Sequence, residues 1–180
     1  MKALEKVARI TPGALLCRGL AFGFTLTALV MAIPTWALGA RTVGAAGLAA
    51  VLVGLLPGTR IVTLVLLGGV VGWFIGLLNA TESLTLWRLI GFSAALYLAH
   101  SSAALAAIVP HDAILAPDVL VRWYAKSLGI VGLTAVMALV LLVGSTMVTG
   151  WETTWIASVV GLVAALAVIS VLARLYRRQP

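Results

Sequence analysis

The side chain best suited to chemistry in this sequence is His100, which lies near the middle of an apolar run from residue 84 to 109. On a helical wheel, Ser93, Tyr97 and His100 fall on one face, within about 60° of one another. An ionisable group inside a membrane is costly and is by default a functional hypothesis. His100 is therefore a candidate proton relay, substrate contact or haem ligand. The alternative is a neutral imidazole that hydrogen-bonds a hydroxyl on a neighbouring helix and serves packing.

Few other groups in the sequence could complete a catalytic or metal site. His111 lies eleven residues after His100, about 16 Å along a helix, so the two cannot bind one haem iron. Ser101 and Ser102 follow His100 directly, and adjacent residues point about 100° apart on a helix. Cys17 is the only cysteine, which excludes an intrachain disulfide. Motifs of the Gly-x-Ser-x-Gly, His-Glu-x-x-His and P-loop types do not occur. We therefore expect no enzyme activity, no metal site and no cofactor.

Three charged residues mark the segment most suited to docking a protein. Asp118, Arg122 and Lys126 are four residues apart and share one face of a predicted helical lead-in, which Pro117 would start. They belong to the most polar internal connection, residues 110–126. We expect this cytoplasmic loop to be either a docking site for a partner or a solvated elbow between two spans.

A second pair of charged residues flanks the start of the run that contains the histidine. Glu82 and Arg88 are six residues apart and could form an ion pair. Arg88 could instead gate a pathway, or extend its guanidinium to the lipid headgroups while its aliphatic stem stays in apolar surroundings.

Small residues at helical spacing predict where helices pack closely. Gly68, Gly72 and Gly76 form a repeated GxxxG pattern, and such patterns let helix backbones approach and associate through van der Waals contact. Shorter stripes of the same kind are formed by Gly19 and Gly23 and by Ala99 and Ala103. We expect these faces to pack on other helices, either within the chain or in another subunit.

The composition of the chain indicates that these residues lie in membrane-embedded segments. The 180 residues are 63% hydrophobic and 9% charged, with a mean hydropathy of +1.18. Soluble domains carry about 25% charged residues, so this chain has too little polar surface for a water-soluble globule. The formal net charge is +7, and its cations lie at the ends of apolar runs. This placement indicates membrane topology rather than nucleic-acid binding.

Six apolar runs are predicted to cross the lipid bilayer. About 20 apolar residues span the hydrocarbon, and a helix satisfies its own backbone groups there. Residues 1–18 are predicted as a cytoplasmic, amphipathic N-terminal segment. The predicted spans are residues 19–36, 42–56, 61–78, 84–109, 127–148 and 155–173. The second is the weakest prediction, because it is short and rich in Gly and Ala. The predicted fold class is all-α, one polytopic membrane domain over residues 1–180 with a bundle of six transmembrane helices.

The cations predict the orientation of this bundle. If both termini are cytoplasmic, ten of the twelve Lys and Arg residues lie on the inner side, and only Arg41 and Arg88 lie on the outer side. Such a bias is what the positive-inside rule requires. Trp123 and Tyr124 then fall at an inner interface, where amphipathic rings are favoured. We therefore expect an N-in/C-in arrangement.

Two functions agree with these features. The first is an accessory or scaffolding subunit of a larger membrane complex, suggested by the small size, the small-residue faces and the lack of intramembrane acids. The alternative is a small transporter or channel with a pathway lined by His100 and Tyr97. An intramembrane enzyme has no catalytic set to support it. The expected partners are the lipid bilayer and other membrane subunits, not nucleic acid. High Ala, Gly, Val and Arg usage is typical of GC-rich bacterial genomes, so we expect a bacterial inner (plasma) membrane.

Overall fold

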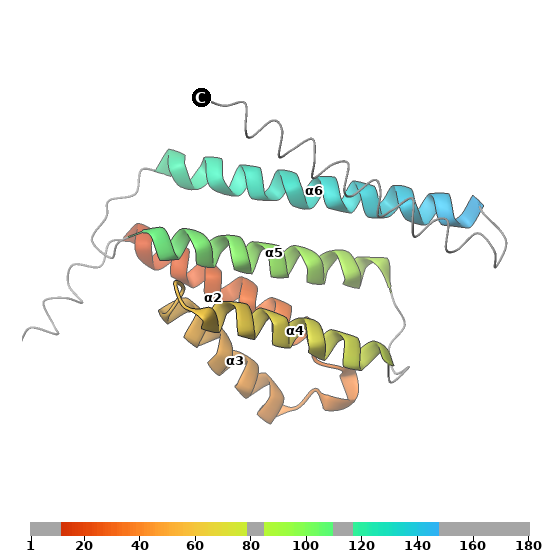
Figure 1. Ribbon diagram of the computed structural model, residues 1–180, viewed down its shortest axis with the longest axis horizontal. Coiled ribbons are helices and arrows are strands. Elements are labelled where there is room, and N and C mark those ends of the chain that lie inside the picture. The colour runs from red at the N-terminus through yellow and green to blue at the C-terminus, as the bar shows by residue number, and fades with distance from the viewer. Residues whose placement is uncertain (1–11, 79–84, 110–116, 148–180) are drawn as a thin grey trace, which may run out of the picture. The chain divides into compact units, whose positions relative to one another are not determined.

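The computed structural model describes residues 12–78, 85–109 and 117–147, which form helices joined by short connections (Figure 1). Within these ranges there is no strand, so the described chain is all-helical, as the sequence predicts. The elements in chain order are α2 (Pro12–Ala32), the short 3-10 helix η1 (Thr35–Ala37), α3 (Ala40–Leu55), α4 (Arg60–Leu78), α5 (Leu86–Ile108) and α6 (Pro117–Met147).

Four of the described helices, α2, α4, α5 and α6, are long and apolar enough to cross a membrane. The structure does not support the predicted full crossing at residues 42–56. Helix α3 has 16 residues and so rises about 24 Å, less than the roughly 30 Å of a hydrocarbon core. The predicted span 155–173 lies outside the described residues. The structure therefore supports a multi-pass membrane protein with four candidate spans, and the count of six stays a prediction.

Two helices begin before the predicted spans that they contain. Helix α2 begins at Pro12, within residues 1–18, which were predicted as a cytoplasmic, amphipathic N-terminal segment, and Cys17 is already buried. Proline suits the first turn of a helix because no backbone N–H is needed there. Helix α6 begins at Pro117, which confirms the predicted helical lead-in, so residues 117–126 of the predicted loop 110–126 are helix. The predicted lead-in and the predicted fifth span thus form one continuous helix.

The chain divides into two compact units, residues 1–132 and 133–180. The first unit holds α2 to α5 and the beginning of α6. In the second unit the structure describes only the remainder of α6, residues 133–147. All of the sites considered below lie in the first unit.

Helices α2 and α5 form the central pair of the first unit. Small side chains line both sides of their contact, so the backbones approach closely and dispersion attraction holds the helices together. A Cβ added at Gly19 or Gly23 would meet nothing within 4 Å, so the contact expected at these glycines does not form in the described structure. The small residues that the two helices bring together in the core, none more than 5% exposed, are Ala21 and Ala28 of α2 and Ala95, Ala99 and Ala103 of α5.

The contact between α3 and α2 depends on one glycine. A Cβ added at Gly54 would lie 3.3 Å from the carbonyl oxygen of Arg18 and 3.4 Å from Cβ of Phe22. Because the first of these atoms belongs to the backbone of α2, a side chain at position 54 has little room. The absence of a side chain at Gly54 is therefore what allows the end of α3 to reach α2.

The predicted GxxxG stripe of α4 faces α2 over only part of its length. A Cβ at Gly76 would lie 3.3 Å from Cγ of Pro34, and one at Gly72 would lie 3.6 Å from the carbonyl oxygen of Ala32. A Cβ at Gly68 would meet nothing within 4 Å. The close approach thus occurs at one end of α4, where α2 ends and η1 begins.

The first unit has one basic end. Gly54, near the end of α3, lies close to Arg18, and Gly58, just before α4, lies close to Ala107 near the end of α5. Cys17 packs in a cluster with residues from the end of α5 and the start of α6. Successive helices run in opposite directions, so the start of one lies near the end of the previous one. Among the described residues, four cations therefore lie at this end: Arg18, Arg60, Arg122 and Lys126. Arg41 and Arg88, at the starts of α3 and α5, lie at the opposite end.

Candidate functional site

Helix α5 carries a polar stripe, Ser93, Tyr97 and His100, on the side opposite its contact with α2. Ser93 and His100 are exposed and Tyr97 is partly exposed. The buried residues of the same helix, such as Ala99 and Ala103, lie on the other side because a helix turns about 100° per residue. Within the described part of the chain, no hydrogen bond involves the three polar side chains. The polar stripe thus lies on one face, as predicted, but that face points away from the helical core.

This position restricts the chemistry that the polar stripe can perform. Lipid tails accept no hydrogen bond, whereas hydroxyls and a neutral imidazole each donate and accept one. Among the described residues, no three His, Cys, Asp or Glu side chains lie close enough together to hold a metal ion. His111, the other histidine, lies outside the described residues. The chemistry available to the polar stripe is therefore hydrogen bonding and proton exchange with groups from outside the described helices.

A second polar cluster joins α5 to α6, and sequence reasoning did not single it out. Trp123 Nε1 donates a hydrogen bond of 2.9 Å to Ser101 Oγ, which lies 3.0 Å from Ser127 Oγ. The hydroxyl of Tyr124 lies 2.9 Å from Ser102 Oγ. Both serines of α5 are buried. The sequence assigned Trp123 and Tyr124 to an aromatic belt at the membrane interface. The one available signal was that two serines and two ring donors lay at the same predicted end.

The hydrogen bond between Ser102 and Tyr124 can be tested with a double-mutant cycle. We expect Ser102→Ala and Tyr124→Phe to be non-additive by about 0.6 kcal/mol and by no more than about 1.7 kcal/mol, the range for interhelical hydrogen bonds in membranes. The measurement is SDS-induced unfolding in mixed micelles, followed by circular dichroism. The matched control cycle pairs Tyr124→Phe with Arg41→Leu, an exposed position at the opposite end of the first unit, and the two changes should be additive. Strict additivity of Ser102→Ala and Tyr124→Phe as well would show that the bond contributes nothing.

Arg88 is held at the opposite end of the first unit. Its Nη2 donates a hydrogen bond of 3.4 Å to the carbonyl oxygen of Met31, in the last turn of α2. Its guanidinium carbon lies 5.3 Å from the ring centroid of Trp73, which stacks on Phe92 at 4.5 Å and 6°. A cation is favoured at a helix C-terminus and over an aromatic face. Arg88 therefore links α2, α4 and α5, while Glu82, its predicted partner, lies outside the described residues.

The three docking candidates lie together on the first turns of α6. Asp118, Arg122 and Lys126 are all exposed. The opposite face of these turns contacts α5 through the hydrogen bonds described above. An acidic residue in the first turn, as Asp118 is, interacts favourably with the helix dipole. The candidates thus form one charged face on the first turns of α6, whereas the polar stripe lies on α5.

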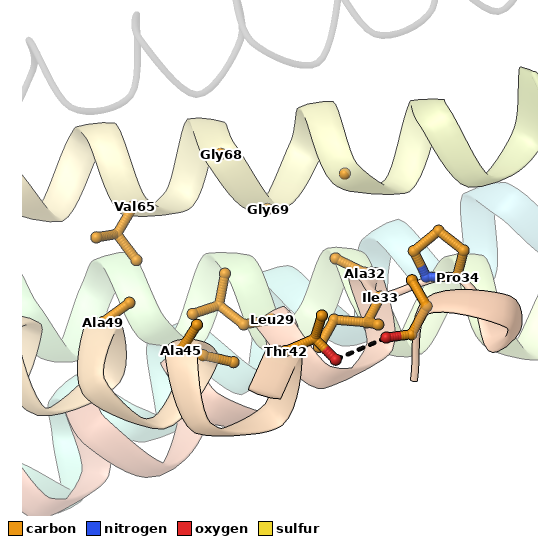
Figure 2. Close-up of a pocket in the computed structure, with 13 residues that line it drawn as sticks. Leu29, Ala32, Ile33, Pro34, Thr42, Ala45, Ala49, Val65, Gly68 and Gly69 are labelled. Carbon is orange, nitrogen blue, oxygen red and sulfur yellow. Dashed lines mark hydrogen bonds between the residues drawn. The ribbon is translucent and has the colours of Figure 1, made fainter. Parts of the chain in front are cut away.

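An open apolar groove of about 400 Å³ lies between α2, α3 and α4 (Figure 2). Thr42 is the only polar residue that lines it. The Thr42 hydroxyl donates to the carbonyl oxygen of Ala37 at 2.6 Å and accepts from the amide of Gly39 at 3.0 Å. The groove therefore presents apolar surface without an available polar group. Its glycine wall consists of Gly68, Gly69 and Gly72 of α4.

Comparison of the chain with protein-family models, with curated proteins and with solved structures finds no match. The interpretation of the site therefore depends on the geometry of the described residues. Of the features above, the serine cluster and Arg88 have partners inside the chain and explain packing. The polar stripe of α5 and the charged face of α6 have no such partner among residues 12–78, 85–109 and 117–147, and they are the candidates for function.

Proposed function

We propose that this protein is an accessory or scaffolding subunit of a larger membrane complex. The observation that carries the proposal is the exposed position of His100, with Ser93 and Tyr97, on a helix long and apolar enough to span a membrane. Polar and ionisable side chains in spanning helices almost always face protein or a water-filled cavity, because lipid cannot solvate them. A neighbouring subunit would provide the hydrogen-bonding surface that the described helices do not.

The charged face of α6 supports the same function at a second place. Asp118, Arg122 and Lys126 are exposed at the basic end of the first unit. The segregation of cations to this end favours a cytoplasmic location for it, by the positive-inside rule. We include in the proposal an N-in/C-in orientation in a bacterial inner membrane, with a cytoplasmic partner docking on this face.

The alternative function, a small transporter or channel with a pathway lined by His100 and Tyr97, has less support. Both residues lie on the outer side of α5, so a pathway past them needs walls from outside the described helices. The groove between α2, α3 and α4 has apolar walls and does not include either residue. We therefore favour the subunit function.

The proposal is tested by the native mass of the particle that a gentle detergent extracts from the membrane. We expect a particle that contains this 18.7 kDa chain together with chains of other sequence. The purified protein alone should move no ion or solute in liposomes. A particle without any other chain would contradict the subunit function. A flux from the purified protein that His100→Leu abolishes would instead establish the transporter.

A further inference from the structure

We propose that α5 carries a dimerisation seam for a second copy of this chain. The inference goes beyond the proposed function, because it assigns the polar stripe to a second copy of this chain and not to a subunit of other sequence. The seam extends the polar stripe by two small residues toward the end of α5. Its members, all exposed or partly exposed, are Ser93, Tyr97, His100, Ala104 and Ala107.

The spacing of the seam is that of a helix-pairing surface. Its members follow one another at intervals of four, three, four and three residues. This alternation is the 3.5-residue repeat at which two helices stay in contact along a left-handed crossing. Most helix pairs in membranes cross in this way, at about 20°, and small residues at the contact let the backbones approach. Ala104 and Ala107 provide such a stretch at one end of the seam.

The seam is also complementary to itself. All copies of a membrane protein insert in the same orientation, so two copies related by a two-fold axis along the membrane normal pair their α5 helices in parallel. Each residue of the seam then lies opposite the same residue of the second copy. The hydroxyls of Ser93 and Tyr97 and the neutral imidazole of His100 each contain one donor and at least one acceptor. Identical residues can therefore hydrogen-bond in pairs.

The charge distribution favours a second copy as the occupant. No Asp, Glu, Lys or Arg belongs to the seam, so a symmetric pair has no like-charge contact across it. Lipid tails would leave the three polar side chains without partners. A pair of identical seams satisfies them without requiring any charged group from another protein.

Cysteine cross-linking in vesicles tests the seam directly. The unmodified protein is a suitable background, because its one cysteine, Cys17, is 0% exposed. Ser93→Cys and Ala104→Cys introduce single thiols within the seam, and Leu64→Cys introduces one on an exposed position of α4. With the pure protein in vesicles of phosphatidylcholine and phosphatidylglycerol, we expect an oxidant to cross-link both seam variants at several times the yield of Leu64→Cys. Equal yields at the three positions would overturn the proposal.

The contribution of the imidazole is measured by energy transfer between labelled copies as vesicle lipid dilutes the protein. His100→Leu should raise the dimer dissociation constant by about threefold to about twentyfold, the range expected for loss of an intramembrane hydrogen bond. His100→Gln keeps a donor and an acceptor and should leave the dimer near its original strength. If His100→Leu and His100→Gln both dimerise as the original protein does, the polar pairing is wrong.

These measurements separate the dimer from the proposed function. Cross-linking by the pure protein, together with an extracted particle that lacks other chains, would support the seam and contradict the subunit function. An extracted particle with other chains, together with no cross-linking at Ser93→Cys or Ala104→Cys, would support the function and overturn the seam. In that case a subunit of other sequence covers the polar stripe.

Discussion

Replacing Gly54 with leucine is expected to lower the free energy of unfolding by about 2 to 3 kcal/mol, the upper part of the range for overpacked contacts. Even a Cβ at this position would lie 3.3 Å from the carbonyl oxygen of Arg18 and 3.4 Å from Cβ of Phe22. The backbone of α2 cannot move aside locally, so a larger side chain must push α3 away from α2. The measurement is SDS-induced unfolding of the purified protein in mixed micelles.

The matched control is the same substitution at Gly44, almost three turns earlier on α3. A Cβ at Gly44 would meet nothing within 4 Å, and the position is exposed. Leucine is a better helix former than glycine by up to about 1 kcal/mol, so Gly44→Leu should be neutral or stabilising. Opposite effects at the two positions would confirm the close contact of α3 and α2. Similar effects at both would show that the contact at Gly54 does not hold the helices together.

Replacing Arg88 with leucine is expected to cost about 2 kcal/mol of stability. The change removes a hydrogen bond from a charged donor to the Met31 carbonyl, a class of bond that contributes roughly 1.5 to 3 kcal/mol. It also removes the guanidinium from the face of Trp73, which contributes roughly 0.5 to 2 kcal/mol. The expected total lies below the sum because Arg88 is partly exposed and the new leucine favours an apolar environment.

The control for Arg88→Leu is Arg41→Leu, at the same end of the first unit. Arg41 is exposed, so its loss should change stability by less than about 0.5 kcal/mol. Arg88→Lys should lie between Arg88→Leu and the original protein, because a lysine keeps the charge but not the planar guanidinium. The free energies come from the same unfolding titrations. A loss of stability as large for Arg41→Leu as for Arg88→Leu would assign the effect to net charge and not to the contacts of Arg88.

Most of the element boundaries could be predicted from hydropathy alone, and the differences have local causes. Residues 61–78 and 84–109 were predicted as spans and correspond to α4 and α5 within two residues at each end. Helices α2 and α6 extend further toward the N-terminus than the predicted spans, because Pro12 and Pro117 suit the first turn of a helix and each helix holds charged residues, Arg18 and Asp118, before its apolar run. Hydropathy marks where a chain is apolar, and a helix can begin before that point.

The candidate site was predictable in part. Helical periodicity alone places Ser93, Tyr97 and His100 on one face, because a face depends only on the turn of the helix. The same periodicity places Ala99 and Ala103 on one helix face. The hydrogen bonds of Ser101 and Ser102 to α6 could not be predicted, because they depend on how a distant segment of the chain docks.

The sequence by itself determined that this protein resides in a membrane, that it is helical and which residues share each helix face. Composition and the 3.6-residue turn are sufficient for these conclusions. Only the tertiary structure decided which face of α5 is buried and which glycines make contact. On α5, His100 is exposed and Ala99 is buried. Gly54 lies in a close helix contact, whereas Gly19 does not. The physical reason is that lipid tails are as apolar as leucine. Hydropathy therefore cannot distinguish a lipid-facing side from a helix-facing side, and close packing of small residues makes that choice.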